Sequence, residues 1–442
     1  MNARAPEIES LLYVDVGSVT TRATYFEIVN SKYRLVASGQ APSTAGAPFE
    51  DVREGVRLAI DGLQGLTGYT LLEQEALIVP ARAAGVGVDA FVITFSVGEP
   101  LRAIAIGLLE DVSLESAVNL AATTYSQVWD RLSLNDHRTT EARIDSILKV
   151  RPDLVIIAGG TEGGATKSVL RLIEAVGLSC FLMQKDRSPE VLYAGNTSMQ
   201  ESIADRLTKV ARLSVAANIR PGLEEERLNV AQAQIALLTA KIRSRQIPGL
   251  SELGEWAGGE IYPTAAAFGR IIRFLSKVHT SPKGVLGIDI GAASTTVAAA
   301  VAGELSLRVY PDLSLGERLP KLLEKTSIRS ILRWIPFDIS ESDVREYVYN
   351  KSLHPQTLPA TVRDLALEQA LARQVLSTAV AQASRAWENL RSMNSGEKRL
   401  NFEPILACGS VLTCVPKYIQ ALMMILDGLQ PVGTTTVVLD QN

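Results

Sequence analysis

Residues 15–21 read Asp-Val-Gly-Ser-Val-Thr-Thr and stand between an apolar run at 11–16 and a stretch rich in β-branched and aromatic residues at 22–29. Residues 289–296 read Asp-Ile-Gly-Ala-Ala-Ser-Thr-Thr and follow a second apolar run. Both stretches indicate strand, tight turn and strand, and each is followed by one more short strand pattern. The sequence therefore predicts two antiparallel meanders of one design.

The turn of each meander has the composition of a phosphate-binding loop. A glycine at its third position permits a tight turn and brings backbone N–H groups close to phosphate oxygens. Hydroxyl residues add donors, and Asp15 and Asp289 at the strand ends would each hold Mg²⁺ through water. A single copy also fits a plain hairpin, but two copies favour a phosphate cleft between two lobes. The expected nucleotide contacts are Gly17, Ser18, Val19, Thr20, Thr21, Asp289, Gly291, Ala292, Ala293 and Ser294.

Two further loops follow predicted strands. An apolar strand at 154–158 leads into the Gly-rich stretch 159–164, and a helix is expected after it. Glycines and a helix start offer N–H groups to an anion, so Gly159, Gly160 and Thr161 are candidate nucleotide contacts; a tight crossover turn is the alternative. A strand at 404–407 leads into a small-residue loop, where Gly409 and Ser410 would lie beside a nucleoside or simply turn the chain into a helix.

The chain's 442 residues are 47% hydrophobic, 21% charged and only 5% aromatic, which favours α/β subdomains rather than one core. We expect an N-terminal lobe at residues 1–250, with the first phosphate motif and a helical insertion. A C-terminal lobe at 251–442 would carry the second motif and the adenosine-side loop. Residues 100–109, which begin with proline, read as a turn element.

Several classes of function are disfavoured. A net charge of −4 provides no basic field for nucleic acid. Three cysteines and three histidines show no metal-ligand spacing, and free thiols fit a reducing compartment. The first ten residues lack a signal-peptide pattern, and apolar runs stay shorter than the ~20 residues of a membrane span. We therefore expect a cytoplasmic protein without a transmembrane segment.

The order of these landmarks resembles the glutamate mutase accessory family, also called MutL or glutamate mutase L, which belongs to the actin-like ATPases. The resemblance runs through 15–21, 154–164, 193–196, 289–296, 314–316 and 408–412. Residues 158–164, Ala-Gly-Gly-Thr-Glu-Gly-Gly, are similar to the family's AGGTDGG and are the most specific part.

The resemblance implies the α/β superfold shared by actin, sugar kinases and 70-kilodalton heat-shock ATPases, with two RNase H-like lobes and mixed sheets. It also implies ATP or ADP with Mg²⁺ between the lobes and Asp15 as the catalytic residue. The implied role is chaperone-like: the exchange of damaged cobalamin from a B12-dependent mutase, driven by ATP hydrolysis.

The chain departs from the family pattern at three points. Ala292 replaces a glycine, Thr296 replaces an aspartate, and Cys408 replaces one of two paired glycines. The missing carboxylate removes a group that would orient Mg²⁺ or water, so we expect weak Mg²⁺-dependent ATP hydrolysis at most. The alternative function is a nucleotide-binding scaffold, homo-oligomer or filament subunit that nucleotide switches without turnover. A small-molecule kinase is a third reading, which lacks an evident catalytic aspartate.

Overall fold

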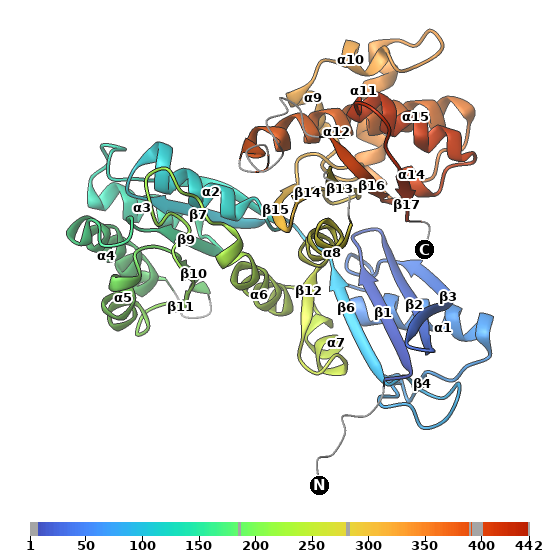
Figure 1. Ribbon diagram of the computed structural model, residues 1–442, viewed down its shortest axis with the longest axis horizontal. Coiled ribbons are helices and arrows are strands. Elements are labelled where there is room, and N and C mark those ends of the chain that lie inside the picture. Colours follow the sequence, from blue (N-terminus) through green and yellow to red (C-terminus); the bar gives the residue numbers. More distant parts are fainter. Residues whose placement is uncertain (1–7, 184–186, 280–282, 389, 391–400, 441–442) are drawn as a thin grey trace. The chain divides into compact units, whose positions relative to one another are not determined.

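The computed structural model describes residues 8–183, 187–279, 283–388, 390 and 401–440. The chain forms two compact units (Figure 1). Unit 1 comprises Met1–Gly98, Arg243–Ser306 and Asp312–Asn442, and unit 2 comprises Glu99–Ile242 and Leu307–Pro311. Unit 2 is therefore an insertion into unit 1, with one additional short piece from later in the chain.

Unit 1 contains two five-stranded sheets of the same topology. In the first, the order is β12-β6-β1-β2-β3; β1–β2 and β2–β3 pair antiparallel, while β1–β6 and β6–β12 pair parallel. In the second, the order is β15-β14-β13-β16-β17; β13–β14 pair antiparallel, while β13–β16 and β16–β17 pair parallel. A meander followed by two parallel strands is the RNase H-like pattern, and its repetition confirms the predicted actin-like fold class.

The strands of the first sheet are β1 (Ser10–Val16), β2 (Thr20–Val29), β3 (Lys32–Pro42), β6 (Ala90–Phe95) and β12 (Ile261–Pro263). Those of the second are β13 (Gly284–Ile290), β14 (Thr295–Val301), β15 (Glu304–Tyr310), β16 (Phe402–Cys408) and β17 (Val437–Leu439). A two-stranded ribbon adds β4 (Leu72–Glu73) and β5 (Ala76–Leu77). Both predicted meanders are confirmed, and their turns have the same register, since Asp15 pairs with Arg22 and Asp289 with Thr296.

Helices pack on these sheets through apolar faces. On the first sheet, α1 (Val52–Thr67) packs against β3, and Asp51 caps its N-terminus. On the second, α8 (Thr264–Val278) and α12 (Val362–Ala383) pack against β14. The long helix α12 begins with a capping box made by Thr361 and Asp364, which satisfies free backbone N–H groups. The other helices that the structure describes in unit 1 are α7 (Leu250–Trp256), α9 (Pro320–Lys325), α10 (Ile328–Leu332), α11 (Glu341–Leu353), the short 3-10 helix η4 (Ser384–Ala386), α14 (Ser410–Thr413) and α15 (Tyr418–Leu429).

Unit 2 is built around a parallel sheet of order β11-β10-β9-β7-β8. Its strands are β7 (Leu101–Gly107), β8 (Ser126–Leu132), β9 (Leu154–Ala158), β10 (Glu190–Tyr193) and β11 (Arg212–Val215). Its described helices are the π-helix η1 (Glu110–Leu114), α2 (Glu115–Ala121), α3 (Thr140–Val150), α4 (Thr166–Leu182), the short 3-10 helix η3 (Thr197–Met199), α5 (Gln200–Leu207) and α6 (Asn229–Gln246), whose end belongs to unit 1. Two buried apolar clusters share the strands of this sheet, as expected when helices cover both faces.

The predicted turn element at 100–109 is wrong, because Leu101–Gly107 is the buried strand β7. Proline stands just before the strand and not within it. The inserted segment is not only helical, since it holds the parallel sheet. The lobe boundary at 250/251 stays a prediction. No helix in the described ranges is both long and apolar enough to cross a membrane.

The end of β15 belongs to unit 2. The Arg308 guanidinium is buried there and donates to the backbone oxygen and Oδ1 of Asn119, at 2.7 and 3.0 Å. The Val309 amide donates to the carbonyl of Ala122 at 2.8 Å. This short strand end is therefore fixed by both backbone and side-chain hydrogen bonds.

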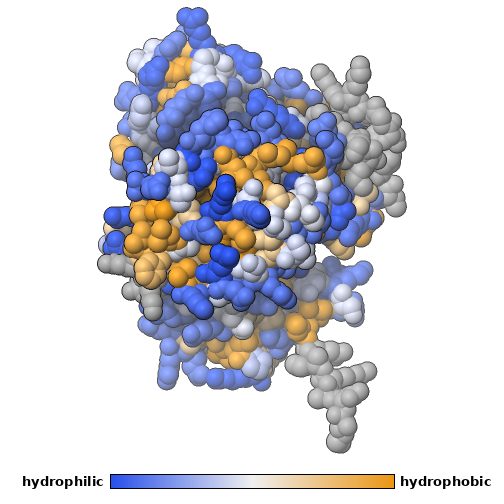
Figure 2. Space-filling model, turned by 90° about the vertical axis from the view of Figure 1, so that its left-hand side faces the viewer, coloured by the Kyte–Doolittle hydropathy of each residue, from blue (hydrophilic) through white to orange (hydrophobic). Residues whose placement is uncertain are grey.

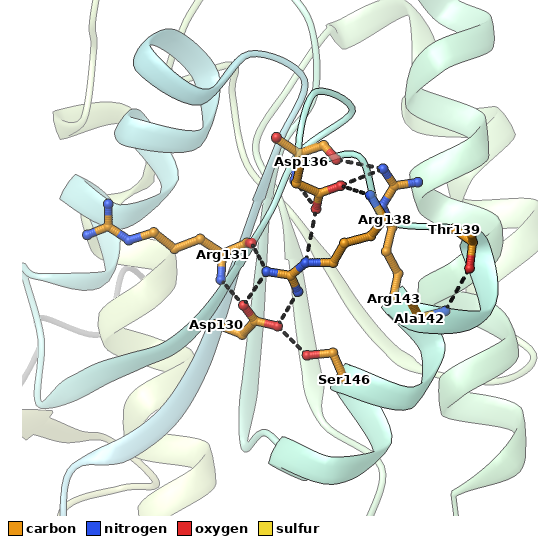
Figure 3. Close-up of polar contacts among 9 residues, drawn as sticks. Asp130, Arg131, Asp136, Arg138, Thr139, Ala142, Arg143 and Ser146 are labelled. Carbon is orange, nitrogen blue, oxygen red and sulfur yellow. Dashed lines mark hydrogen bonds and ion pairs between the residues drawn. The ribbon is translucent and has the colours of Figure 1, made fainter.

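Side chains cover the free edge of β8, the last strand of the unit 2 sheet. Figure 3 shows the Asp130 carboxylate between Arg138 and Ser146, while the Arg131 side chain points away. The Arg131 amide donates to Asp130 Oδ1 at 2.8 Å, and Arg138 Nη2 donates to the Arg131 carbonyl at 3.3 Å. The ion pair thus occupies backbone groups that another strand could otherwise bind.

Arg138→Ala is expected to destabilise the protein by about 1–3 kcal/mol, because a largely buried carboxylate loses its partner. It should also increase self-association through the uncovered strand edge. Urea unfolding and light scattering measure both effects. Arg82→Ala is the matched control: its ion pair with Glu73 is exposed on both sides, so it should cost less than ~0.5 kcal/mol. Equal losses in the two variants would contradict a protective role for Arg138.

Candidate functional site

The two predicted phosphate loops form the same tight turn. The Gly17 amide donates to the carbonyl of Thr20 at 3.0 Å, and the Gly291 amide donates to that of Ser294 at 2.9 Å. A Cβ on Gly17 would lie 2.6 Å from the Thr20 oxygen, and one on Gly291 would lie 3.1 Å from the Ser294 oxygen. The close approach of backbone to backbone explains the glycine in the first turn and favours it in the second.

Both turns present backbone N–H groups that have no partner. Within the described residues, the amides of Ser18, Val19, Ala292 and Ala293 make no hydrogen bond. Behind the turns, the equivalent hydroxyls of Thr21 and Thr295 are buried and also have no partner in this part of the chain. Successive free N–H groups in a turn form a concavity that suits an anion, so the residues present fit a bound phosphate.

The Asp15 carboxylate is held by two hydroxyl groups that sequence reasoning missed. Thr94 and Thr264 each donate to Asp15 Oδ1 at 2.6 Å. The Tyr13 hydroxyl lies 2.8 Å from Thr94 Oγ1 and must be the donor there, because Thr94 gives its proton to Asp15. Asp15 Oδ2 has no partner among the described residues, and this oxygen is the one that suits a magnesium-bound water.

Burial raises the pKa of Asp15, and the hydrogen bonds from Thr264 and Thr94 oppose that rise. Thr264 is also the first residue of α8, whose N-terminal dipole favours a nearby negative charge. The first aspartate is therefore positioned by hydroxyls and a helix end.

Asp289 has a different environment at the equivalent place. Its neighbour across the parallel pair is Cys408, where Asp15 has Thr94. The Asp289 carboxylate accepts no hydrogen bond within the described residues. Burial, followed by the charges of Asp15 and Asp440, raises the pKa of Asp289 to about 7. The charges of Asp15 and of Asp440, a residue that sequence analysis did not select, thus act on the second predicted aspartate.

Cys408 does not have the environment of a nucleophile. Burial and the charges of Asp289 and Asp440 raise the pKa of its thiol well above the usual range, and the thiol hydrogen-bonds to Asp440. A thiol that stays protonated is unreactive, which agrees with a structural role for this residue.

Protonation of Asp289 should make stability depend on pH. Because its pKa in the folded state is raised from 3.8 to about 7, its stabilising contribution is complete below about pH 4 and is lost as pH rises through about 7. After allowance for solvent that reaches the side chain, the loss should be roughly 2 kcal/mol. Denaturant unfolding of the wild type and Asp289→Asn at several pH values measures the difference. If the two profiles remain parallel, Asp289 does not titrate in this range.

Two loops lie against the second turn. Gly409 has φ +94°, and a Cβ there would lie 2.2 Å from the Ile290 carbonyl oxygen. A Cβ on Gly316 would lie 2.3 Å from the carbonyl oxygen of Ala292, and the Leu315 amide donates to the carbonyl of Gly291 at 3.1 Å. Gly409 is therefore packed beside the predicted phosphate loop, and the next residue, Ser410, is exposed.

The third predicted loop lies in unit 2, whereas the other candidate residues lie in unit 1. A Cβ on Gly195 would lie 2.4 Å from the backbone N and O of Gly159, and Asn218 Nδ2 donates to the Gly160 carbonyl at 3.1 Å. The Glu162 carboxylate accepts hydrogen bonds from Thr197 and Asn218. Close packing accounts for glycines here, and nucleotide contact by Gly159, Gly160 and Thr161 stays a prediction.

Within the described residues, no group of three or more His, Cys, Asp or Glu side chains could coordinate a metal ion directly. Mg²⁺ keeps much of its water shell and commonly binds through one or two carboxylates plus phosphate. Asp15 and Asp289 fit that mode, in which water and nucleotide complete the coordination.

The chain is similar to known proteins over most of its length. The family model described as MutL protein matches residues 11–442. Protein MutL of Clostridium tetanomorphum is 21% identical over 431 residues, which cover 92% of this chain and 86% of the relative.

Among solved structures, glycerol dehydratase reactivase is 11% identical, with 95% of each chain covered and a TM-score of 0.34. A nucleotide-free diol dehydratase-reactivating factor is 10% identical, with 95% of this chain and 94% of that chain covered and a TM-score of 0.33. At these values the structural likeness does not bear on function.

Proposed function

Because this chain belongs to the MutL protein family, we propose that it is an ATP-binding accessory protein that serves a cobalamin-dependent mutase. The observation that carries the nucleotide part is the pair of like turns in unit 1, each with backbone amides that are unpaired within the described residues. The charge of Asp15 also contributes to the raised pKa of Asp289. The mutase as partner rests on family membership.

In this proposal each turn donates backbone N–H groups to phosphate oxygens. The amides of Ser18 and Val19 serve one side, and those of Ala292 and Ala293 serve the other. Bound Mg²⁺ would neutralise charge on the phosphates. Thr94 and Thr264 keep Asp15 oriented so that its free oxygen can accept from metal-bound water. Asp289 would ionise fully only when a cation is present or the pH is high, since its pKa is raised.

Turnover is expected to be slow. Phosphoryl transfer to water needs a group that orients the attacking water, and Thr296 stands where the family has a carboxylate. Nucleotide would then act mainly by stabilising one conformation of unit 1, by an amount set by its difference in affinity for two states.

Calorimetry with ATP and ADP, each with and without Mg²⁺, tests nucleotide binding, and a phosphate-release assay on the same samples tests turnover. We expect Mg²⁺-dependent binding and release far slower than the usual enzymatic range of about 1–1,000 per second. Absence of ATP binding under all of these conditions would refute the nucleotide site.

The partner requires its own test. A cobalamin-dependent mutase from the same organism is inactivated by a cobalamin that lacks the adenosyl group, then incubated with this protein, adenosylcobalamin and ATP. Recovery of mutase activity that needs both this protein and ATP is the expected result. Nucleotide-dependent pelleting without any recovery would instead support the filament alternative.

A further inference from the structure

We propose that unit 2 carries a second ligand site, a cavity that accepts an organic cation attached to an apolar or aromatic body. The cavity has a volume of about 380 Å³ and is lined by residues of unit 2 only, among them Glu110, Leu114, Trp129 and Ser133. It shares no residue with the turns around Asp15 and Asp289, so it is independent of the proposed nucleotide site.

The cavity lies along the edge strand β8, whose residues 128–131 line it, and beside the segment that follows β7. Glu110 and Leu114 belong to η1, which follows β7, and Ser133 directly follows β8. The segment after β7 is also a π-helix, which is rare and often occurs at functional sites.

Trp129 is placed by an irregularity in β8. Ala103 of β7 pairs with Val128 and Ile104 pairs with Asp130, so Trp129 is the extra residue of a β-bulge. Such bulges redirect side chains, and Trp129 is 60% exposed, while Trp256 and Trp334 are half-buried and Trp387 is buried. Figure 2 shows a face where hydrophobic residues gather within a mostly hydrophilic surface. An exposed aromatic ring beside a cavity is a platform for a cation or an aromatic group.

Most charges around the cavity are already paired. Partial burial raises the pKa of Asp130, but hydrogen bonds from Arg138, Ser146 and the Arg131 amide outweigh it and leave the pKa below its usual value. Burial likewise raises the pKa of Asp136, but hydrogen bonds, chiefly from Arg143, leave that pKa below its usual value. Both carboxylates therefore stay ionised and are satisfied by protein groups.

Among the charged residues that line the cavity, Glu110 differs in having no protein partner in the described residues. Its exposed carboxylate has no ion pair or hydrogen bond within the described part of the chain. Arg131 faces Glu115 at 3.8 Å in an exposed ion pair, and its side chain points away from Asp130 (Figure 3). The free charge is thus negative and lines the same cavity as Trp129, a combination that attracts a cation with an apolar stem.

Ser133 supplies a polar anchor. It is 1% exposed, and its Oγ has no hydrogen-bond partner among the described residues. Its amide and carbonyl are engaged by Asp136 and Arg143. A buried hydroxyl left without a partner is costly, and rotation of this side chain toward the cavity would let it accept an N–H of the ligand.

The test uses two probes with the same ring and opposite charge, 2-phenylethylammonium and 3-phenylpropionate, titrated into the full-length protein. Tryptophan fluorescence and calorimetry follow binding. We expect saturable binding of the cation and roughly tenfold weaker binding of the anion. Equal binding of the two probes, or no saturable binding of the cation, would overturn the proposal.

Variants locate the site. Glu110→Gln should weaken cation binding about fivefold, and Trp129→Leu should remove the fluorescence response and most of the affinity. Asp145→Asn changes an exposed carboxylate outside the cavity and should have no effect. Circular dichroism melts check that each variant folds. Cation affinity unchanged in both cavity variants would place the binding elsewhere.

The cation could come from a free amine or from a Lys or Arg side chain of a partner protein. A short Lys-Phe peptide with blocked ends is therefore titrated beside the free amine. Tighter binding of the peptide identifies a protein side chain as the source, whereas tighter binding of the amine identifies a small molecule.

Discussion

Asp15→Asn is expected to raise the stability of the nucleotide-free protein and to remove most of its affinity for Mg²⁺-bound ATP. Burial of the carboxylate, together with the nearby charge of Asp440, raises the pKa of Asp15 despite the hydrogen bonds from Thr264 and Thr94. Asparagine has the same shape, keeps an oxygen for the hydroxyls of Thr94 and Thr264, and carries no charge. Removal of the charge should stabilise the free protein by about 1–2 kcal/mol.

The same change should weaken binding of Mg²⁺–ATP by about 30–100-fold, because the amide is a poor acceptor for water bound to a divalent cation. Binding of ATP in the presence of a chelator should change little or improve, since a negative charge next to the phosphates is lost. Thermal melts and calorimetry with and without Mg²⁺ measure the two effects.

Asp61→Asn is the matched control, because Asp61 is an exposed residue of α1. It should alter neither property. If Asp15→Asn lowers the stability of the free protein, the carboxylate is a structural hydrogen-bond acceptor rather than a desolvated charge kept for function.

Gly409→Ala is expected to cost about 3–5 kcal/mol of stability and to weaken nucleotide binding. The new Cβ would lie 2.2 Å from the oxygen and 2.8 Å from the carbon of the Ile290 carbonyl, both backbone atoms that cannot rotate away. Relief of the contact requires the loop at 408–410 to move from the turn at 290–292. Denaturant unfolding and calorimetry with Mg²⁺–ATP check both consequences.

Gly433→Ala separates the cost of a positive φ from the cost of the steric contact with Ile290. Gly433 also has a positive φ, +77°, but a Cβ there meets nothing within 4 Å. It should therefore show only the conformational penalty, about 1 kcal/mol. Similar losses in the two variants would mean that the contact with Ile290 contributes little.

The two meanders could be predicted from the sequence because each depends on a turn whose residues are neighbours in the chain. The bond from Gly17 to Thr20 spans three residues, and the turn composition is visible in one short stretch. The duplication then predicted two like lobes. The strand β7 was missed for a physical reason: a strand buried on both faces shows a continuous apolar run, without the alternation that marks a half-exposed strand.

The environment of the aspartates could not be predicted in the same way. Thr94 lies 79 residues from Asp15, and Thr264 lies 249 residues away, beyond the whole insertion. Their contacts depend on parallel pairing and on the start of α8, neither of which leaves a local pattern. The same holds for Cys408, whose equivalence to Thr94 appears only when β13 and β16 pair.

The short piece Leu307–Pro311 has a consequence for protein engineering. A chimaera that exchanges residues 99–242 alone would disturb the hydrogen bonds from the Arg308 guanidinium to Asn119 and from the Val309 amide to Ala122. Grafting of unit 2 between relatives therefore has to carry both segments together. Recombination that cuts the gene only at the ends of the long segment is expected to yield insoluble products.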